Sequence, residues 1–298
     1  MEKPKLSFQD LIKKIHEKGI SNGNFSNDDI LSYLKERSYY YKISSYRKSY
    51  PKRPDGLYSD LTFEHLTITA NLDLSLREYL LNLCLDIEHA TRTKLMSLIT
   101  EDDTEDGYSI IKEFKDTYPP IFEKVMNHFK NNKHKRDMFN KRTEISIWVF
   151  LEIIDYGTLV RLLEFYFHRK PDSRSKLLPN QHKFVKNIRN TCAHNNVFII
   201  NLFDPHYRIP RPDATTKSFA NSMKINFGLL PYQKIIDLTN LFYLHKKLCS
   251  PQLNKRRVEE GKKILSLYND KKELFSLSNQ ISKLFDSILN KGVDFLKE

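Results

Sequence analysis

The sequence is poor in glycine and cysteine and has no long apolar run. Eight glycines in 298 residues argue against a fold built from many short strands and tight turns. The three cysteines, Cys84, Cys192 and Cys249, form no CxxC pair, which indicates free thiols in a reducing compartment. No stretch approaches the roughly 18 apolar residues of a membrane span, and the first residues lack the apolar region of a secretory signal. We therefore expect a cytoplasmic protein that makes no membrane contact.

Two kinds of ligand pattern are also missing. The ten histidines are scattered, and no His, Cys, Asp and Glu spacing is typical of a metal site. No glycine-rich loop is present that would cradle the phosphates of a nucleotide. We expect no metal and no cofactor.

The residues that are abundant favour helices. Leu, Ile, Lys and Glu recur in long runs without Gly or Pro, so the predicted fold class is all-α. We expect an N-terminal helical segment over residues 1–58, a helical core over 59–203, and a loop followed by C-terminal helices over 204–298. Caps and apolar spacing predict the individual helices: one from Ser7, one from Ser26, a long one from Phe63 to Thr100, one from Ile145 to His168, one near 181–195, and others near 232–249 and within 255–292. The stretch 204–231 is rich in Pro and Thr and is predicted to be a loop.

An excess of positive charge favours a polyanionic partner. The chain carries 49 basic and 37 acidic side chains, a formal charge of +12. Each phosphate that such a surface neutralises releases counterions and adds affinity. Two segments are candidate RNA contacts: an aromatic-basic block over 39–50, which includes Tyr46, Arg47 and Lys48, and a basic segment over 127–142, which includes Lys135 and Arg136. Tyrosine packing and a solvated helix face explain the two segments equally well.

The most informative stretch runs from Phe184 to Asn195. On a helical wheel its apolar residues cluster on one side, whereas Arg189 and His194 lie on the flank and the opposite side. The pair is therefore expected to face outward near the end of one helix. A second Arg-to-His spacing, Arg161 to His168, lacks both the Asn after Arg and the Ala-His-Asn ending, and we treat it as a chance match.

Four motifs in order resemble those of Abi-like (abortive infection) proteins over roughly residues 8–201. They are the opening stretch with Lys18-Gly19-Ile20 and Tyr40–Tyr46; Phe63-x-His65-Leu66 leading to Leu76-Arg77 and Ile87-Glu88-x3-Arg92; Trp148-x3-Glu152-x4-Gly157-x-Leu159; and Arg189-Asn190-x2-Ala193-His194.

The resemblance implies a HEPN-like helical bundle and metal-independent RNA cleavage in phage defence or toxin–antitoxin systems. Arg, a polar residue and then His after four intervening residues is the HEPN ribonuclease motif. Because two such motifs build one site in related proteins, the resemblance also implies a homodimer. By the same analogy, a structured noncoding RNA is a possible regulator.

The chemistry of these residues fits that function. RNA carries its own nucleophile, the 2′-OH, so a His that titrates near neutrality and an Arg that binds phosphate oxygens can suffice. We expect Arg189, His194 and Asn190 to be catalytic and Asn195 and Glu88 to support them, Glu88 by holding Arg189 or Arg92. The expected products carry 2′,3′-cyclic phosphate and 5′-OH ends. Two alternatives stay open: a catalytically silent RNA-binding protein of the same fold, and a protein-binding regulator that uses residues 204–298.

Overall fold

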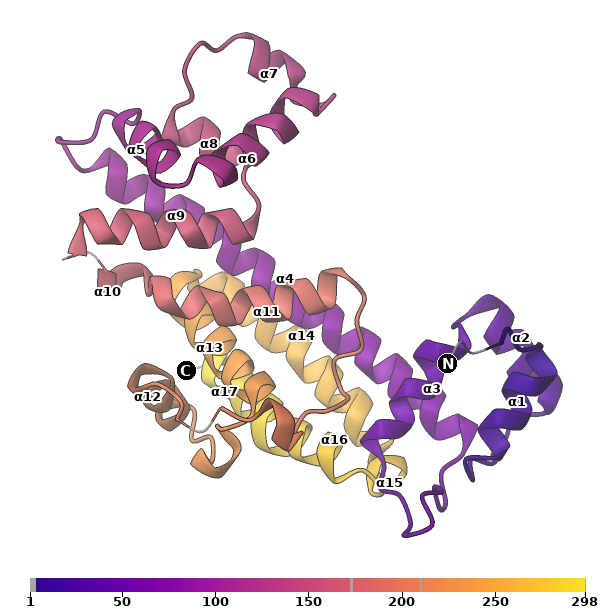
Figure 1. The fold of residues 1–298 in the computed structure, drawn as a ribbon. Helices are drawn as coiled ribbons and strands as arrows, with labels where there is room; N and C mark the ends of the chain where they lie inside the picture. The colour runs from indigo at the N-terminus through magenta and orange to yellow at the C-terminus, as the bar shows by residue number, and fades with distance from the viewer. Residues whose placement is uncertain (1–3, 172–173, 210, 298) are drawn as a thin grey trace.

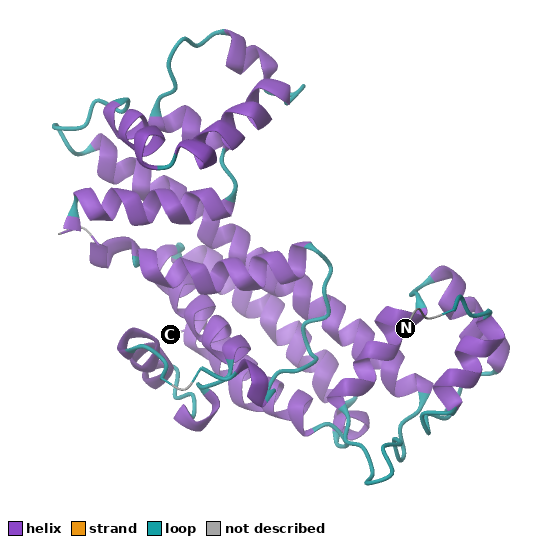
Figure 2. Ribbon diagram, in the orientation of Figure 1, coloured by secondary structure: helices purple, strands orange, loops and turns teal. Residues whose placement is uncertain are grey.

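The structure, a computed structural model, describes residues 4–171, 174–209 and 211–297. Within these ranges the chain consists of helices and loops, and its β pairing is limited to two isolated bridges (Figure 2). The all-α prediction is confirmed. The α-helices are α1 (Phe8–His16), α2 (Asn27–Glu36), α3 (Tyr40–Ser45), α4 (Phe63–Thr100), α5 (Ser109–Thr117), α6 (Pro119–Asn131), α7 (Arg136–Asn140), α8 (Ile147–Ile153), α9 (Tyr156–Arg169), α10 (Arg174–Leu177), α11 (His182–Ala193), α12 (Ala214–Ser222), α13 (Gln233–Leu248), α14 (Pro251–Asn269), α15 (Lys272–Phe275), α16 (Asn279–Leu284) and α17 (Asn290–Lys297).

The 38-residue helix α4 organises the molecule. It begins where Thr62 accepts a hydrogen bond from the backbone N–H of His65, and it has buried side chains on more than one side. The helices α11, α13 and α14 pack along it, α3 contacts it near its start, and α9 contacts it towards the other end (Figure 1). In the part of the chain described, no helix is both long enough and apolar enough to cross a membrane.

Three groups of helices are therefore joined through α4 (Figure 1). The N-terminal helices α1–α3 lie at one end, an upper lobe of α5–α8 lies at the other, and α11, α13, α14 and α17 form a bundle between them. The bundle is tightly packed at Gly292 of α17, where a Cβ atom would collide with the ring of Phe242 on α13.

Several helix starts follow their predicted caps. Ser7 and Ser26 each accept a hydrogen bond from the N–H three residues on, 3.1 Å long in both cases, and an aspartate at that position reaches back. The prediction for Phe63 to Thr100 agrees with α4 residue for residue.

The prediction of one helix from Ile145 to His168 is wrong. The chain breaks between α8 and α9, where Ile154 is extended and the Asp155 carboxylate accepts from the N–H of Thr158 at 2.7 Å. Asp155 is thus an N-cap inside an apolar run. Arg92 of α4 donates to the carbonyls of Leu151 and Ile154. Two carbonyls that have no partner within α8 at its end therefore accept hydrogen bonds from a side chain.

The stretch 204–231 is also not all loop. It contains α12, which begins where Asp213 accepts from the N–H of Thr216 at 2.8 Å. The last predicted segment is divided as well: α14 ends at Asn269, and a π-helical turn, Phe285–Leu289, separates α16 from α17.

One buried carboxylate connects three distant parts of the chain. Asp73 of α4 is 0% exposed, and its Oδ2 accepts from the Tyr46 hydroxyl at 3.0 Å and from Arg77 Nε at 2.8 Å. Its Oδ1 accepts from the backbone N–H groups of Phe198 and Ile199 at 2.8 and 2.9 Å. Because these donors satisfy the charge, Asp73 holds the segment after α11 against α4.

We expect Asp73→Ala to destabilise the fold by about 3–5 kcal/mol, since it leaves the Arg77 guanidinium and two backbone N–H groups buried without their acceptor. Urea unfolding followed by circular dichroism measures the change. Glu78→Ala, at an exposed position on the same helix, is the control and is expected to change the free energy of unfolding little. Equal stability of the two variants would show that Asp73 does not hold these segments together.

Candidate functional site

The Arg-to-His motif lies on α11 and its C-terminal cap, and it faces outward only in part, although both residues were predicted to do so. The apolar face of α11 is buried between α4 and α13, as expected from the helical wheel; the buried residues are Phe184, Val185, Ile188 and Cys192. Asn190 and His194 are exposed, and Arg189 is half-buried. The motif is thus divided between the edge of the core and the surface.

The end of α11 is fixed by a Schellman motif. Asn195 has a left-handed conformation with φ of 56°, its N–H donates to Cys192 O at 3.0 Å, and the N–H of Asn196 donates to Thr191 O at 3.0 Å. His194 is the residue directly before this reversal, so its imidazole projects from the helix end and is exposed.

Asn195 is anchored by side chains from two other helices. Its Oδ1 accepts from Arg77 Nη1, and its carbonyl accepts from Lys42 Nζ at 3.1 Å. Since Arg77 is itself bound to Asp73, the buried carboxylate network extends to the residue next to His194. These contacts fix the position of Asn195, and with it the C-terminal end of α11.

Arg189 and Glu88 each keep a buried polar atom without a partner. Arg189 Nε is buried and makes no hydrogen bond to a described residue, and the same holds for Glu88 Oε2. The other oxygen of Glu88 accepts from Arg92 Nη2 at 2.6 Å. Of the two arginines that we considered for Glu88, the geometry therefore pairs it with Arg92.

The second Arg-to-His spacing differs in this respect. Arg161 forms an ion pair with Glu164 at 3.1 Å, and its guanidinium lies 5.5 Å from the centre of the Tyr118 ring. Its charge is thus already engaged, whereas the guanidinium of Arg189 has no ion-pair partner among the described residues.

The expected RNA contacts of the aromatic-basic block are only partly accessible. Tyr46 is 1% exposed and donates to Asp73, so the prediction that its ring stacks on a base is wrong. Arg47 is half-buried and donates to Ser44 O, whereas Lys48 is exposed.

The other basic segment lies in the upper lobe. Lys135 donates to Glu152 O, and Arg136, the first residue of α7, is exposed. Since α7 is at the far end of this lobe, the structure does not bring these two residues to the end of α11 (Figure 1).

A cavity of about 420 Å³ next to Asn195 carries positive charge that the sequence analysis missed. We call it the basic cavity; it lies between the N-terminal helices and α4, and its basic residues are Arg37, Lys42 and Arg77. Burial, together with the neighbouring Arg77 guanidinium, lowers the pKa of Lys42. In the sequence, the signal for this cavity was the pair Asp73 and Arg77, two opposite charges four residues apart on a mostly apolar helix.

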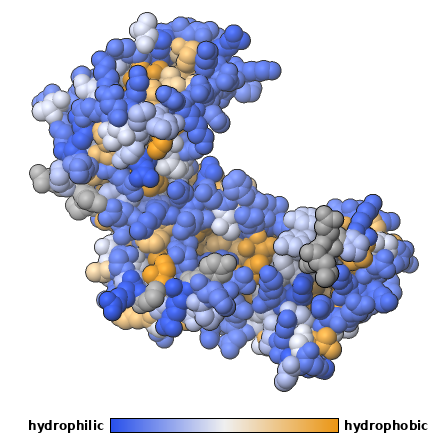
Figure 3. All heavy atoms as spheres, viewed as in Figure 1, coloured by the Kyte–Doolittle hydropathy of each residue, from blue (hydrophilic) through white to orange (hydrophobic). Residues whose placement is uncertain are grey.

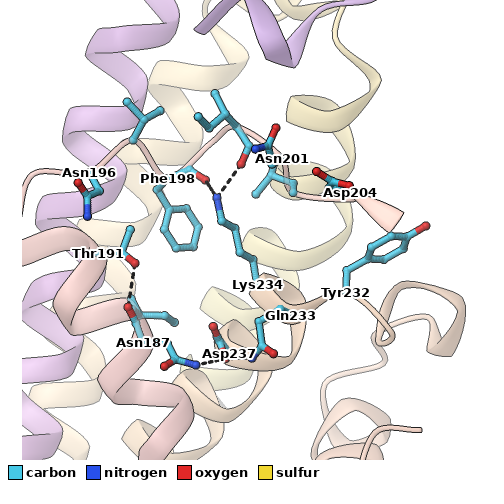
Figure 4. Close-up of a pocket in the computed structure, with 14 residues that line it drawn as sticks. Asn187, Thr191, Asn196, Phe198, Asn201, Asp204, Tyr232, Gln233, Lys234 and Asp237 are labelled. Carbon is cyan, nitrogen blue, oxygen red and sulfur yellow. Dashed lines mark hydrogen bonds between the residues drawn. The ribbon is translucent and has the colours of Figure 1, made fainter. Parts of the chain in front are cut away.

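A second cavity, of about 410 Å³, has Asn196, the residue after Asn195, in its lining. We call it the α11–α13 pocket, because α11, the chain after it and the start of α13 line it (Figure 4). The same region is a hollow with exposed hydrophobic atoms in the lower body of the space-filling view (Figure 3). Lys234 reaches across from α13 and donates to the carbonyls of Phe198 and Ile200 at 2.7 and 2.6 Å.

Asp237 forms the polar floor of the α11–α13 pocket. Its Oδ1 accepts from Gln233 Nε2 at 2.6 Å and from Asn187 Nδ2 at 3.2 Å. Burial raises the pKa of Asp237 to about 7, and burial lowers the pKa of Lys234 to about 8. Two groups of opposite charge in this pocket thus titrate close to neutrality.

The raised pKa of Asp237 predicts a pH-dependent contribution to stability. Because folded Asp237 binds its proton more tightly than the unfolded chain does, this contribution is present at about pH 4 and is lost as the pH rises to about 7. We expect the wild type to lose free energy of unfolding over this range relative to Asp237→Asn, which cannot ionise. Denaturation at several pH values tests this, and a constant difference between the proteins would contradict it.

A comparison with protein families confirms the resemblance to Abi-like proteins. The family described as Abi-like protein matches residues 32–199, more than half of the chain. This span contains Asp73, Arg77 and the whole of α11, and it ends at Ile199, one of the donors to Asp73. No curated protein and no solved structure matches the chain. Because the matched residues, from the second half of α2 to beyond the end of α11, make up more than half of the chain, it belongs to the Abi-like protein family.

Proposed function

We propose that this chain is a metal-independent RNA endonuclease of the HEPN type that acts in abortive infection. The observation that carries the proposal is the exposed His194 at a rigidly capped helix end, between an unpaired arginine and a basic cavity. An abortive-infection role follows from the family, and cleavage of RNA follows from the chemistry of the residues.

The reaction uses the nucleophile of the substrate. His194 takes the proton of a ribose 2′-OH, and the 2′-oxygen attacks the adjacent phosphorus. The bond between phosphorus and the 5′-oxygen breaks, and a protonated His194 of the partner subunit gives its proton to that oxygen. The products are a 2′,3′-cyclic phosphate and a 5′-OH. Arg189 binds the phosphate oxygens as charge accumulates on them.

The geometry of α11 favours a site shared by two copies. Residues five positions apart on a helix point in directions about 140° apart. Arg189 and His194 of one chain therefore point to different sides of α11. One chain alone does not bring both residues to the same phosphate, and a second copy can supply the other one. Asn190, exposed between them, can orient the phosphate.

An apolar stripe on α4 supports the dimer. Leu74 and Leu85 are 45% and 46% exposed, and the partly buried Leu81 lies between them. Leu74 also lines the basic cavity together with Asn195, so the stripe begins beside the motif. Exposed leucines in line on a helix that borders the site fit a surface covered by a second copy.

His194→Ala is expected to lower the rate of RNA cleavage by about 10²–10⁴-fold, because it removes the group that transfers the proton. The measurement is cleavage of a mixed RNA in EDTA, with the product ends identified by their chemistry. His168→Ala, the histidine of the chance match, is the control and is expected to cleave at the wild-type rate. Equal cleavage by wild type and His194→Ala would remove His194 from the mechanism.

The dimer is tested separately. Leu74→Lys combined with Leu85→Lys places two charges in the stripe and is expected to weaken dimerisation by at least about tenfold, since each buried charge costs more than 1 kcal/mol. Sedimentation measures the dissociation constant, and cleavage is expected to fall with it. Leu267→Lys, at a 49% exposed position on α14, is the matched control. An active monomer would contradict the shared site.

A second function, RNA binding without cleavage, is favoured by the basic cavity and the +12 charge. It predicts binding that weakens steeply with salt and forms no product ends. The same cleavage and binding measurements separate the two functions.

A further inference from the structure

We propose that the α11–α13 pocket binds a nucleobase, and that the base belongs to the RNA strand whose backbone lies at His194. The assignment to the RNA strand rests on the proposed ribonuclease function, whereas the assignment to a nucleobase rests on the pocket alone. The pocket would make the enzyme select the nucleotide next to the one it cuts.

The place of the pocket in the chain is the first argument. Thr191, one turn before His194, and Asn196, two residues after it, both line the pocket. The Schellman hydrogen bond from Asn196 N to Thr191 O joins these two residues, so the rim of the pocket and the imidazole are parts of one rigid helix end. A strand that places a phosphate at His194 has its neighbouring base within reach of this rim.

The size and lining of the pocket fit a planar heterocycle. A volume of about 410 Å³ lies within the range of small-molecule sites. Apolar and aromatic side chains line much of the wall, among them the rings of Phe198 and Tyr232 (Figure 4); the lining residues of these kinds are Ile188, Val197, Phe198, Ile200, Leu202 and Tyr232. Proteins recognise unpaired bases by apolar or aromatic contact with the ring together with hydrogen bonds to its edge.

Asp237 supplies the hydrogen-bonding edge. Asp237 is 4% exposed, and its two side-chain donors, Asn187 and Gln233, are both bonded to Oδ1. The other oxygen, Oδ2, has no hydrogen-bond partner among the described residues, and neighbouring atoms do not enclose it completely. It is therefore available to a molecule in the pocket. A carboxylate there accepts from an exocyclic amine or ring N–H of a base, and its protonated form donates to a ring nitrogen or carbonyl.

The charges of the pocket disfavour a phosphate. Lys234 is the cation there, and two of its donors are already used by the carbonyls of Phe198 and Ile200. Asp204, together with Asp237 in its ionised form, adds negative charge to the same lining. Carboxylates in this lining would repel a phosphate, whereas the basic cavity has three cationic side chains in its lining. The two cavities thus divide the parts of a nucleotide between them.

The test uses 2′-O-methyl oligonucleotides, which lack the nucleophile and so report binding without cleavage. A set carries A, C, G, U or an abasic residue at each position in turn, and fluorescence anisotropy gives the affinity. We expect one base to bind at least about tenfold more tightly than the abasic residue at one position. In Asp237→Asn the amide nitrogen replaces the free oxygen, a donor replaces an acceptor, and the preferred base is expected to change.

Two further variants serve as controls. Asp116→Asn makes the same change of charge at an exposed position on α5 and is expected to keep the wild-type preference. Ile200→Trp fills the pocket from its half-exposed rim without changing Asp237, and is expected to abolish the preference while binding of the abasic strand is kept.

The outcomes separate this proposal from the ribonuclease. A base preference that depends on Asp237 supports the pocket even if no variant cleaves RNA. If free nucleosides bind in a way that depends on Asp237, but the RNA strands show no base preference, then the pocket binds a nucleobase. The proposal that this base belongs to the RNA strand is then overturned. If the base-bearing and abasic strands bind equally in every variant, and nucleosides do not bind, the pocket does not hold a nucleobase.

Discussion

The buried carboxylate of Asp73 is the interaction on which the arrangement of the site depends. A charge with 0% exposure is tolerated only when donors surround it, and here they come from η1 (Tyr46–Ser49), from α4 itself and from the chain after α11. Three segments far apart in the sequence must therefore meet at one point. Arg77 then extends the network to Asn195, and Asn195 fixes the helix end from which His194 projects. The exposed histidine is held in place from the core.

This dependence explains which features of the fold were predictable. Local signals were strong enough for caps and apolar spacing to predict α1, α2, α4 and the buried face of α11. The break at Asp155 was missed because an N-cap inside an apolar run is indistinguishable from a surface residue of a longer helix until its partner N–H is known. The helix α12 was missed because its composition, rich in Thr and Ser, is typical of a loop.

The site was predictable only where one segment carries it. Arg189, Asn190 and His194 lie within a single helix and its cap, so sequence spacing placed them correctly on α11. The partners of that helix end, Lys42 and Arg77, come from positions more than a hundred residues away, and no spacing rule connects them to His194. Tyr46 shows the opposite error: its place in an aromatic-basic block suggested a surface, but its hydroxyl is a donor that a buried carboxylate needs.

The unpaired Nε of Arg189 is the feature that most separates this motif from the second Arg-to-His spacing. A structural arginine is normally satisfied, as Arg161 is by Glu164 and Arg92 is by Glu88 and two carbonyls. Arg189 instead keeps a buried Nε without an acceptor, although the likewise unpaired Oε2 of Glu88 belongs to the helix packed against α11. Leaving the buried Nε without an acceptor costs stability, and an anion that accepts from it would offset that cost. Under the proposed function that anion is a phosphate of the RNA strand, which the proposed dimer would present to the imidazole of a second copy.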